Sequence, residues 1–343
     1  MLNLSQNGCF VWVTSSTELA LTPTVIALGK FDGVHRGHQQ VIQPILPQER
    51  NGERAGGNNS VSLPRAYSTV VTFNPHPQEF FTGQPHDLLT PVDEKVYQLR
   101  SLGVEQLVLL PFDKELSILT PEQFVEKILV QQLQCKRISV GEDFRFGSKR
   151  SGTASDLQSI ASKYDIPVTI VTLKTSGDDA LTDTTAPRIS TSLIRQHLER
   201  GDIERANQLL GRPYTLIGPV IKGQQLGRTI GFPTANLKLP KQKFLPRFGV
   251  YAVRVKSLGE VPDAVVQDFL GVMNIGIRPT VNGIDPSVEV HLLDWSGDLY
   301  CKKLTVQVEK FLRPEQKFSS LEALKTQIQL DSAAARAFFC TEC

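Results

Sequence analysis

The first half of the chain alternates short apolar runs with segments whose apolar residues recur at helical spacing. Apolar or β-branched runs occur at 9–13, 25–28, 66–73, 104–110 and 137–140. Between them we expect three helices. One opens at 39–42, one starts with Thr90 as N-cap and Pro91 as first residue, and one covers 121–133 with Thr120 as its cap. Strands that alternate with helices are typical of α/β proteins. The pattern therefore predicts a Rossmann-like, parallel, doubly wound sheet over residues 9–173.

Beyond residue 213 apolar and polar residues instead alternate at every second position, as in 251–255, 288–292 and 304–309. Period two with glycine turns predicts antiparallel strands that close into a small β-barrel. Residues 319–322 have the form of a capping box, which predicts a C-terminal helix with Leu321, Leu324 and Ile328 on one face.

Two short helices are expected between these halves. The first starts at a Ser-rich segment and stops at Gly201, and the second is capped by Asp202 and ended by Gly211. Pro213 follows. Because 343 residues suit two domains, we predict domains at 1–212 and 213–343.

Composition narrows the setting of the protein. The net charge of +2 argues neither for nor against nucleic acid, and the first basic residue is Lys30. Five cysteines, an odd number, suggest free thiols in a reducing compartment, although the pair Cys340 and Cys343 could bind metal or cycle redox. We expect a cytoplasmic protein with neither a membrane nor nucleic acid as partner.

The segment 29–39, Gly-Lys-Phe-Asp-Gly-Val-His-Arg-Gly-His-Gln, carries the strongest chemical signal. A buried strand, a glycine turn and a helix start together make a natural anion site. His35 and His38 are three residues apart and share a helical face, and Gly37 would let a phosphate approach the backbone. The alternative is an ordinary strand–turn–helix with two surface histidines.

This segment resembles the His-x-Gly-His signature of the α/β nucleotidyltransferases, in the form found in bacterial bifunctional riboflavin kinase/FAD synthetases. The resemblance implies that His35 and His38 contact the ATP phosphates as pyrophosphate leaves. It also implies that Gly29, Phe31 and Gly37 contribute to ATP binding.

Three further segments of the first half resemble the same family. They are Asn74-Pro75-His76-Pro77, the stretch Gly141–Gly147, and Arg188–Arg195, in which a Ser and a Thr of the family pattern are exchanged. The resemblance implies flavin binding by Phe144 and Phe146. It implies binding or orientation of the ATP phosphates by Asn74, Asp143, Ser190, Thr191, Ser192 and Arg195.

The second half carries a decapeptide, Gly227–Asn236, that resembles the flavokinase signature. The resemblance implies that Gly227, Arg228 and Gly231 wrap the ATP phosphates, while the oxygens of Thr234 and Asn236 suit Mg²⁺. The segment 288–294 resembles the family segment whose Glu is the catalytic base, which implies that role for Glu289. The segment 273–280 resembles a family loop near the flavin, which implies flavin binding by Asn274 and Arg278. Standing alone, Glu289 would be a surface carboxylate on a half-exposed strand.

The resemblance covers nearly the whole chain and implies a bifunctional transferase. It would phosphorylate riboflavin to FMN with ATP and Mg²⁺ and then adenylylate FMN to FAD. One alternative is that only the kinase half is active and the product is FMN. Another is a flavin-binding sensor without turnover. The polar insertion at 48–60 departs from the family pattern, and we expect it to be harmless to the chemistry.

Overall fold

The structure is a computed structural model that describes residues 11–47, 65–172, 188–223, 227, 230–258, 268–280 and 283–341. Within 257–258, 278–280 and 283–285 only the backbone is described. The expected insertion at 48–60 and Cys343 lie outside the described residues. The chain forms two compact units, Met1–His86 with Lys95–Ile189, and Asp87–Glu94 with Ser190–Cys343.

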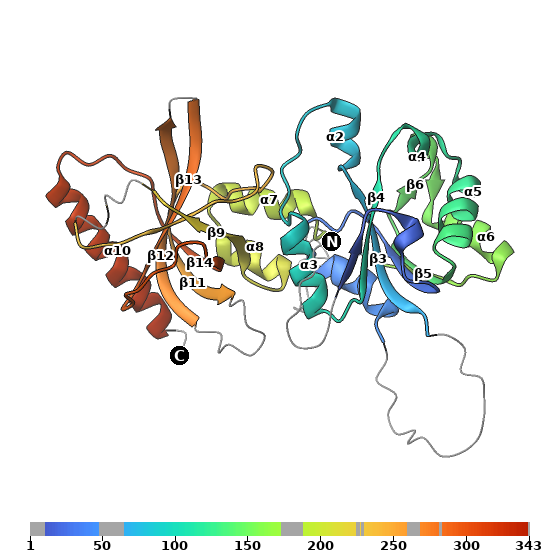
Figure 1. Ribbon diagram of the computed structural model, residues 1–343, viewed down its shortest axis with the longest axis horizontal. Coiled ribbons are helices and arrows are strands. Elements are labelled where there is room, and N and C mark those ends of the chain that lie inside the picture. Colours follow the sequence, from blue (N-terminus) through green and yellow to red (C-terminus); the bar gives the residue numbers. More distant parts are fainter. Residues whose placement is uncertain are drawn as a thin grey trace, which may run out of the picture. The chain divides into compact units, whose positions relative to one another are not determined.

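The first unit is built on a six-stranded parallel sheet with the strand order β1-β4-β3-β2-β5-β8 (Figure 1). Its strands are β1 (Trp12–Thr14), β2 (Thr24–Leu28), β3 (Tyr67–Asn74), β4 (Gln106–Pro111), β5 (Cys135–Gly141) and β8 (Val168–Val171). A hairpin of β6 (Arg145–Phe146) and β7 (Gly152–Thr153) follows β5. The parallel α/β prediction for this half is confirmed.

Helices follow the strands. They are α1 (Arg36–Ile42), α2 (Pro77–Thr82), α3 (Val92–Ser101), α4 (Lys114–Ile118), α5 (Pro121–Gln123) running into η3 (Phe124–Gln132), and α6 (Ala154–Ala161). The three helices that the sequence analysis predicts for this half are present as α1, α3 and α5 with η3. Single turns are η1 (Thr17–Leu19), η2 (Gln43–Ile45), η4 (Ser148–Arg150) and η5 (Ser162–Tyr164). Consecutive residues of β3 and β4 are buried, which means that both faces of the sheet are covered.

Two helix starts differ from the prediction. Helix α1 begins at Arg36 rather than Gln39, because the side chain of His35 caps it by accepting a hydrogen bond from the His38 backbone. Helix α3 begins at Val92, so Thr90 and Pro91 precede it instead of opening it. By contrast, Thr120 caps α5 in a full capping box with Gln123, as the start signal predicted.

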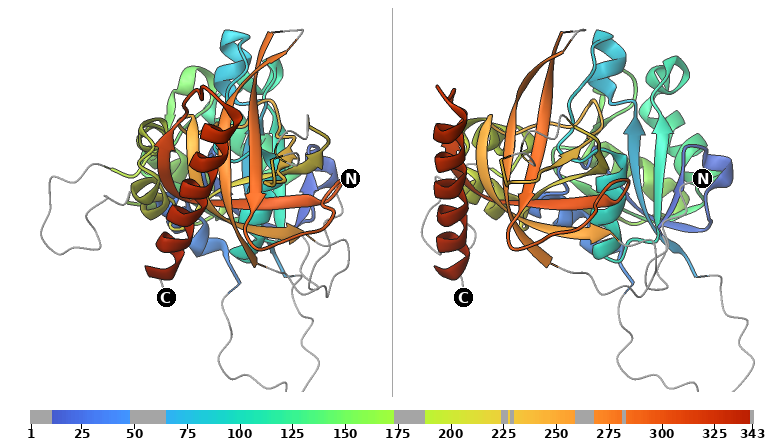
Figure 2. Two further views of the ribbon diagram at one scale, coloured as in Figure 1. Left: turned by 90° about the vertical axis from the view of Figure 1, so that its left-hand side faces the viewer. Right: turned by 60° about the vertical axis from the view of Figure 1, so that its left-hand side comes forward.

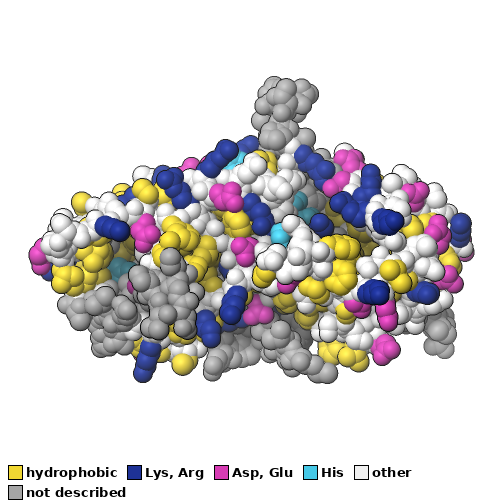
Figure 3. All heavy atoms as spheres, turned by 90° about the horizontal axis from the view of Figure 1, so that it is seen from above, with side chains coloured by type: hydrophobic (Ala, Val, Ile, Leu, Met, Phe, Trp, Pro, Cys, Tyr) yellow, Lys and Arg dark blue, Asp and Glu magenta, His cyan; other side chains and the backbone are white. Residues whose placement is uncertain are grey.

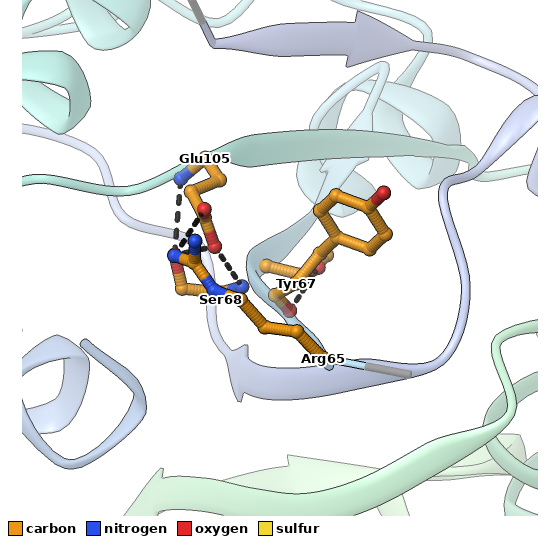
Figure 4. Close-up of polar contacts among 5 residues, drawn as sticks. Arg65, Tyr67, Ser68 and Glu105 are labelled. Atoms are coloured by element: carbon orange, nitrogen blue, oxygen red, sulfur yellow. Dashed lines mark hydrogen bonds and ion pairs between the residues drawn. The ribbon is translucent and has the colours of Figure 1, made fainter. Parts of the chain in front are cut away.

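A carboxylate fixes the amino ends of β3 and β4 against each other (Figure 4). Glu105 Oε2 accepts hydrogen bonds from the backbone N–H and the hydroxyl of Ser68, at 2.9 and 3.1 Å. Its other oxygen pairs with Arg65 at 2.6 Å, and the Glu105 N–H donates to Ser68 Oγ. These bonds set the register that places the carboxyl ends of the two strands side by side.

The second unit contains a closed antiparallel barrel with the strand order β10-β13-β12-β11-β14-β9. Its strands are β9 (Tyr214–Ile221), β10 (Ala235–Leu237), β11 (Gly249–Leu258), β12 (Asp268–Thr280), β13 (Gly283–Leu292) and β14 (Lys303–Pro314). Two helices precede the barrel, α7 (Thr191–Arg200) and α8 (Ile203–Leu210). Ser190 and Asp202 cap them and Gly201 and Gly211 end them, all as predicted.

Helix α10 (Leu321–Thr341) lies along the outside of the barrel, as the two views of Figure 2 show. The predicted capping box is wrong by one residue, since Ser320 rather than Ser319 caps the helix through the Ala323 N–H at 3.1 Å. The buried face carries Asp331, Ala335 and Phe339, and Leu321 is exposed. The helix register follows from Asp331, which pairs with Arg313 of β14 at 2.7 Å.

The second unit takes in α7, α8 and the short segment Asp87–Glu94 from the first half of the sequence. Asn207 of α8 donates a hydrogen bond to the Val308 carbonyl at 2.9 Å and accepts one from the Tyr214 N–H at 2.7 Å. The predicted division at 212/213 concerns where one activity ends and the next begins, and it stays a prediction.

Among the described residues, no helix is long and apolar enough to cross a membrane. On the face drawn in Figure 3, basic and acidic side chains are interspersed, in keeping with the small net charge.

A buried ion pair holds Asp87–Glu94 to the barrel unit. Lys243 Nζ lies 2.5 Å from Glu94 Oε2, and both side chains are only 1% exposed. Lys243 also donates to the Leu89 carbonyl at 2.6 Å, and Glu94 Oε1 accepts from the Ile217 N–H at 3.1 Å. Burial raises the pKa of Glu94, while the charge of Lys243 opposes that shift. Each charge is therefore tolerated in the interior only because the other is present.

Removing one partner of this pair should be far more harmful than removing both. Lys243→Met leaves a buried carboxylate without its cation and should lower the free energy of unfolding of the second unit by about 3–5 kcal/mol. Adding Glu94→Met should restore part of that loss. Urea titrations followed by the fluorescence of Trp295, in a Trp12→Phe background, measure the second unit alone, because Trp12 and Trp295 are the two tryptophans.

The half-exposed pair of Lys256 and Asp268, 3.6 Å apart, serves as the control. Lys256→Met should cost less than about 1 kcal/mol. Equal losses from Lys243→Met and Lys256→Met would show that burial does not govern the first pair.

Candidate active sites

The turn between β2 and α1 has an unusual backbone. Phe31, Gly33 and Val34 have positive φ values of 48°, 88° and 44°. The left-handed region is costly for a β-branched residue such as Val34. Side chains that hold the turn must therefore compensate, and Thr72 of β3 does so by donating a hydrogen bond to the Lys30 carbonyl at 2.8 Å.

His35 and His38 are brought together as the sequence predicts. Their rings stack with centroids 3.6 Å apart and an interplanar angle of 17°. A Cβ at Gly37 would make a tight contact with the His35 ring, so glycine suits the packing of the imidazole here. Phe31 is buried and lies with its ring edge-on to His38, at 5.3 Å between centroids. Gly29 in turn makes room for the Phe31 ring.

The environment of His38 favours the neutral form of its imidazole. Burial lowers its pKa well below 6.5, and the neighbouring His35, Lys95 and Arg188 act in the same direction. Its buried Nδ1 has no hydrogen-bond partner in the described part of the chain. A buried polar atom of this kind in a cluster of basic groups fits a ligand with phosphate oxygens.

Two lysines that the motif analysis did not use belong to this site. Lys95 of α3 is 5% exposed and donates a hydrogen bond to the Lys30 carbonyl at 3.3 Å. Burial lowers the pKa of both ammonium groups, and the carboxylate of Asp32 opposes the shift in each case. The sequence did offer one signal that Lys95 is buried, because it lies four residues before the apolar Leu99 on the same face of the predicted helix.

The proline-flanked histidine also lies near the site. His76 caps α2 through the Gln78 N–H at 3.2 Å, and its ring stacks on His86 at 4.3 Å. Burial lowers the pKa of His76 to about 4, with further contributions from Lys30 and His86. Asn74, at the end of β3, is exposed.

The Gly141–Gly147 segment divides into a polar and an apolar part. Asp143 pairs with Arg188 at 2.5 Å, which ties it to the start of the Arg188–Arg195 motif. Phe146 is buried in the core against Phe124, at 5.6 Å between ring centroids. Phe144 is half-buried and stacks on Phe146 at 5.7 Å. Phe144 thus offers more surface to a ligand than Phe146 does.

The hydroxyl motif lies at the start of α7, in the second unit. Ser190 Oγ accepts a hydrogen bond from the Leu193 N–H at 3.2 Å, which is the capping role that the sequence predicts. Thr191 is half-buried and Ser192 exposed. Arg195 donates to the Asp87 carbonyl and lies over the Phe244 ring at 4.9 Å. Phosphate binding by these four residues stays a prediction.

A second group of predicted residues meets on the outer wall of the barrel. Val288 and Val290 of β13 are buried in the barrel, so the intervening Glu289 faces outward. It is paired in register with Asn236 of β10 and Asn274 of β12. Thr234 Oγ1 donates a hydrogen bond to Glu289 Oε2 at 3.2 Å.

The described residues of the glycine loop are held by hydrogen bonds within the loop and to β13. The Gly227 carbonyl accepts a hydrogen bond from the Phe232 N–H at 2.7 Å, and Gly231 has a φ of 89°. His291 Nδ1 lies 2.9 Å from the Pro233 carbonyl and fixes the end of the loop. A Cβ at Gly223 would collide with the carboxamide of Asn236. Arg228 and the side chain of Arg278 lie outside the described residues.

One acidic residue of this surface was missed by sequence reasoning. The carboxylate of Glu315 lies against Gly276, close to the Asn274 amide, so that a Cβ on Gly276 would collide with it. Asn274 and Gly276 are two residues apart on β12 and share a face. A carboxylate just after a strand that ends in a proline carries no signal in the sequence alone.

Comparison with known proteins identifies both halves. A family model for FAD synthetase matches residues 17–185, and one for riboflavin kinase matches residues 210–339. The chain therefore joins the domains of two transferases that use flavins.

Relatives that carry both domains match along nearly the whole chain. The bifunctional riboflavin kinase/FMN adenylyltransferase of Escherichia coli K12 is 40% identical over 316 residues, 92% of this chain and 92% of that protein. The Bacillus subtilis protein of the same description is 36% identical over 325 residues, again 92% of each. The chain belongs to the family of bifunctional riboflavin kinase/FMN adenylyltransferases.

A solved structure is similar over both units. A crystal structure described as a macrolide-efflux protein from Streptococcus pneumoniae matches with a TM-score of 0.74 and 28% identity. The match covers 95% of this chain and 98% of that one.

The low pKa of His76 predicts a loss of stability in acid. The unfolded chain binds a proton at His76 near the ordinary value of 6.5, whereas the folded protein does so only near 4. Between these two pH values the unfolded state holds more protons, so stability should fall as pH drops from about 6.5 to about 4. Thermal unfolding of the first unit, followed by Trp12 fluorescence in a Trp295→Phe background at pH 7 and pH 5, should show a smaller drop in unfolding temperature in His76→Gln. Equal drops in the two proteins would contradict the assignment.

Proposed function

We infer that the chain makes FAD from riboflavin in two ATP-dependent steps, as its relatives are named for doing. The riboflavin kinase domain phosphorylates riboflavin to FMN, and the FAD synthetase domain adenylylates FMN with release of pyrophosphate. The observation that carries this function is the presence of both domains, in the same order, in relatives matched over 92% of their length.

In the kinase step we assign the proton transfer to Glu289. The ribityl 5′-hydroxyl oxygen bonds to the γ-phosphorus of ATP, the bond from that phosphorus to the bridging oxygen breaks, and ADP leaves. Glu289, half-buried and hydrogen-bonded to Thr234, accepts the hydroxyl proton. The oxygens of Thr234 and Asn236 beside a carboxylate suit Mg²⁺, which would neutralise phosphate charge. Gly227, Arg228 and Gly231 would follow the ATP phosphates, and Asn274 and Arg278 would hold the flavin.

The adenylyl step needs no protein nucleophile and no proton transfer. A phosphate oxygen of FMN, already anionic, bonds to the α-phosphorus of ATP as the bond to the pyrophosphate oxygen breaks. His35 and His38 would donate hydrogen bonds to the phosphates, with Gly29, Phe31 and Gly37 shaping the turn. Phe144 and Phe146 are assigned to the flavin. Asn74, Asp143, Ser190, Thr191, Ser192 and Arg195 complete the proposed set of ATP ligands.

The cytoplasmic location expected from the cysteines stays part of this proposal. The proposed small-molecule partners are riboflavin, FMN and ATP.

The direct test is to incubate the protein with riboflavin, ATP and Mg²⁺ and to separate the flavins by chromatography. FAD supports both steps, and FMN alone leaves only the kinase. Unchanged riboflavin, together with FMN that is also inert with ATP, refutes the proposal.

Glu289→Gln should separate the two activities. The amide keeps the size of the side chain but cannot accept the hydroxyl proton, so FMN formation should fall by at least about 100-fold. Formation of FAD from supplied FMN should survive. Glu322→Gln, an exposed change at the start of α10, is the control and should leave both rates unchanged. Loss of both activities in Glu289→Gln with the fold intact would contradict the separation of sites.

His38→Ala should have the opposite effect. The variant loses a donor to the phosphates, so it should convert riboflavin to FMN at the normal rate and make FAD about 100-fold more slowly. The kinase rate of the same sample is the control for folding. An undiminished FAD yield would remove His38 from the mechanism.

A further inference from the structure

One buried charge of the first unit, that of Lys95, forms no close ion pair with a described residue, although the carboxylate of Asp32 acts on it from nearby. Lys95 is 5% exposed, and within the described part of the chain its ammonium forms no ion pair. The Lys95 ammonium donates a long hydrogen bond of 3.3 Å to the Lys30 carbonyl. The same carbonyl also accepts a hydrogen bond from the Thr72 hydroxyl at 2.8 Å. An ammonium has three donors, and leaving a charged group so poorly paired in the interior is costly.

The place of Lys95 indicates what could pair with it. The Lys30 carbonyl lies two residues beyond the end of β2, and Thr72 belongs to the last part of β3, so Lys95 Nζ lies near the carboxyl ends of two central strands. Ligands of open α/β sheets bind at this edge. The charge of Lys95 also reaches both His38 and His76.

The surrounding charges favour an anion. Lys30, Arg150 and Arg188 act on the same cluster, and the carboxylates near it are Asp32 and Asp143. Asp143 already pairs with Arg188. His38 and His76 both lie among these charges. The buried Nδ1 of His38 has no hydrogen-bond partner among the described residues. Two neighbouring buried polar groups thus lack the partners that a polyphosphate would supply.

We propose that Lys95 is a phosphate-binding residue of adenylyl transfer, whose Nζ donates to the β- and γ-phosphates that leave as pyrophosphate. The proposal rests on the proposed function of the first unit. As the bond between the α-phosphorus and the bridging oxygen breaks, the electron pair stays on pyrophosphate, and a fixed buried cation stabilises that charge without reorganisation.

A purely structural role predicts different behaviour. If Lys95 only clamps the Lys30 carbonyl, a neutral donor at this position should do equally well. Lys95→Gln retains an N–H donor and removes the charge, while Lys95→Met removes both. Arg100→Met removes one positive charge from the same helix at a half-buried position, five residues further on, and serves as the control.

The experiment uses inorganic pyrophosphate as the probe on the full-length protein. In the wild type, pyrophosphate should inhibit FAD formation and raise the unfolding temperature of the first unit, because it binds the folded state. Both Lys95→Met and Lys95→Gln should weaken pyrophosphate binding and slow FAD formation by about 100-fold, with the KM for FMN and the kinase rate unchanged. Arg100→Met should behave like the wild type.

Three results would overturn the proposal. One is wild-type pyrophosphate binding in Lys95→Gln, which would leave Lys95 a structural clamp. Another is a parallel loss of affinity for FMN, which would assign Lys95 to the acceptor phosphate. The third is an equal defect in Arg100→Met, which would make the effect one of net charge. If Lys95→Met does not fold, the comparison of Lys95→Gln with the wild type decides. Failure of the proposed function is distinguishable, because the wild type would then make no FAD.

Discussion

Burial of charge is the constraint on which both units depend. Helix α3 carries two consecutive buried charges, Glu94 and Lys95. Glu94 has an ammonium at 2.5 Å and a backbone donor, and its role is complete within the folded chain. Lys95 has one long bond to a carbonyl. Because a buried ion is stable only with compensation, the first arrangement serves the fold and the second fits a ligand that brings its own negative charge.

The barrel separates stability from chemistry by the alternation of its strands. On β13 the inward residues Val288, Val290 and Leu292 form the core, and the outward Glu289 and His291 meet the glycine loop. Antiparallel register then places Asn236 and Asn274 on either side of the carboxylate. A substitution at Glu289 therefore removes no core contact, which is why it can test catalysis without unfolding the barrel.

Several local signals in the sequence predicted local structure correctly, although those at Thr90 and Ser319 missed the helix start by one or two residues. The caps at Thr120, Ser190 and Asp202 need only side chains within three residues of the helix start, and each is confirmed. Long-range partners were invisible to that reasoning. On α10 the predicted residues Leu324 and Ile328 are half-buried and Leu321 is exposed, but the pairing of Asp331 with Arg313 of β14 had no signal in the sequence. Likewise, nothing near Lys243 in the sequence shows that it is buried or that Glu94 is its partner. For Lys95 the position in line with Leu99 indicated burial, but no signal showed that it lies beside the Lys30 carbonyl.

The depressed pKa of His38 and His76 bears on how the first unit could handle phosphate charge. Imidazoles held neutral at pH 7 can donate hydrogen bonds, but they supply no positive charge. Lys95 contributes to the lowered pKa of both histidines, and Lys30 to that of His76. Donation and charge thus come from different side chains. A rate that depended on protonated histidine would fall with rising pH, whereas hydrogen-bond donation by a neutral imidazole does not require that proton.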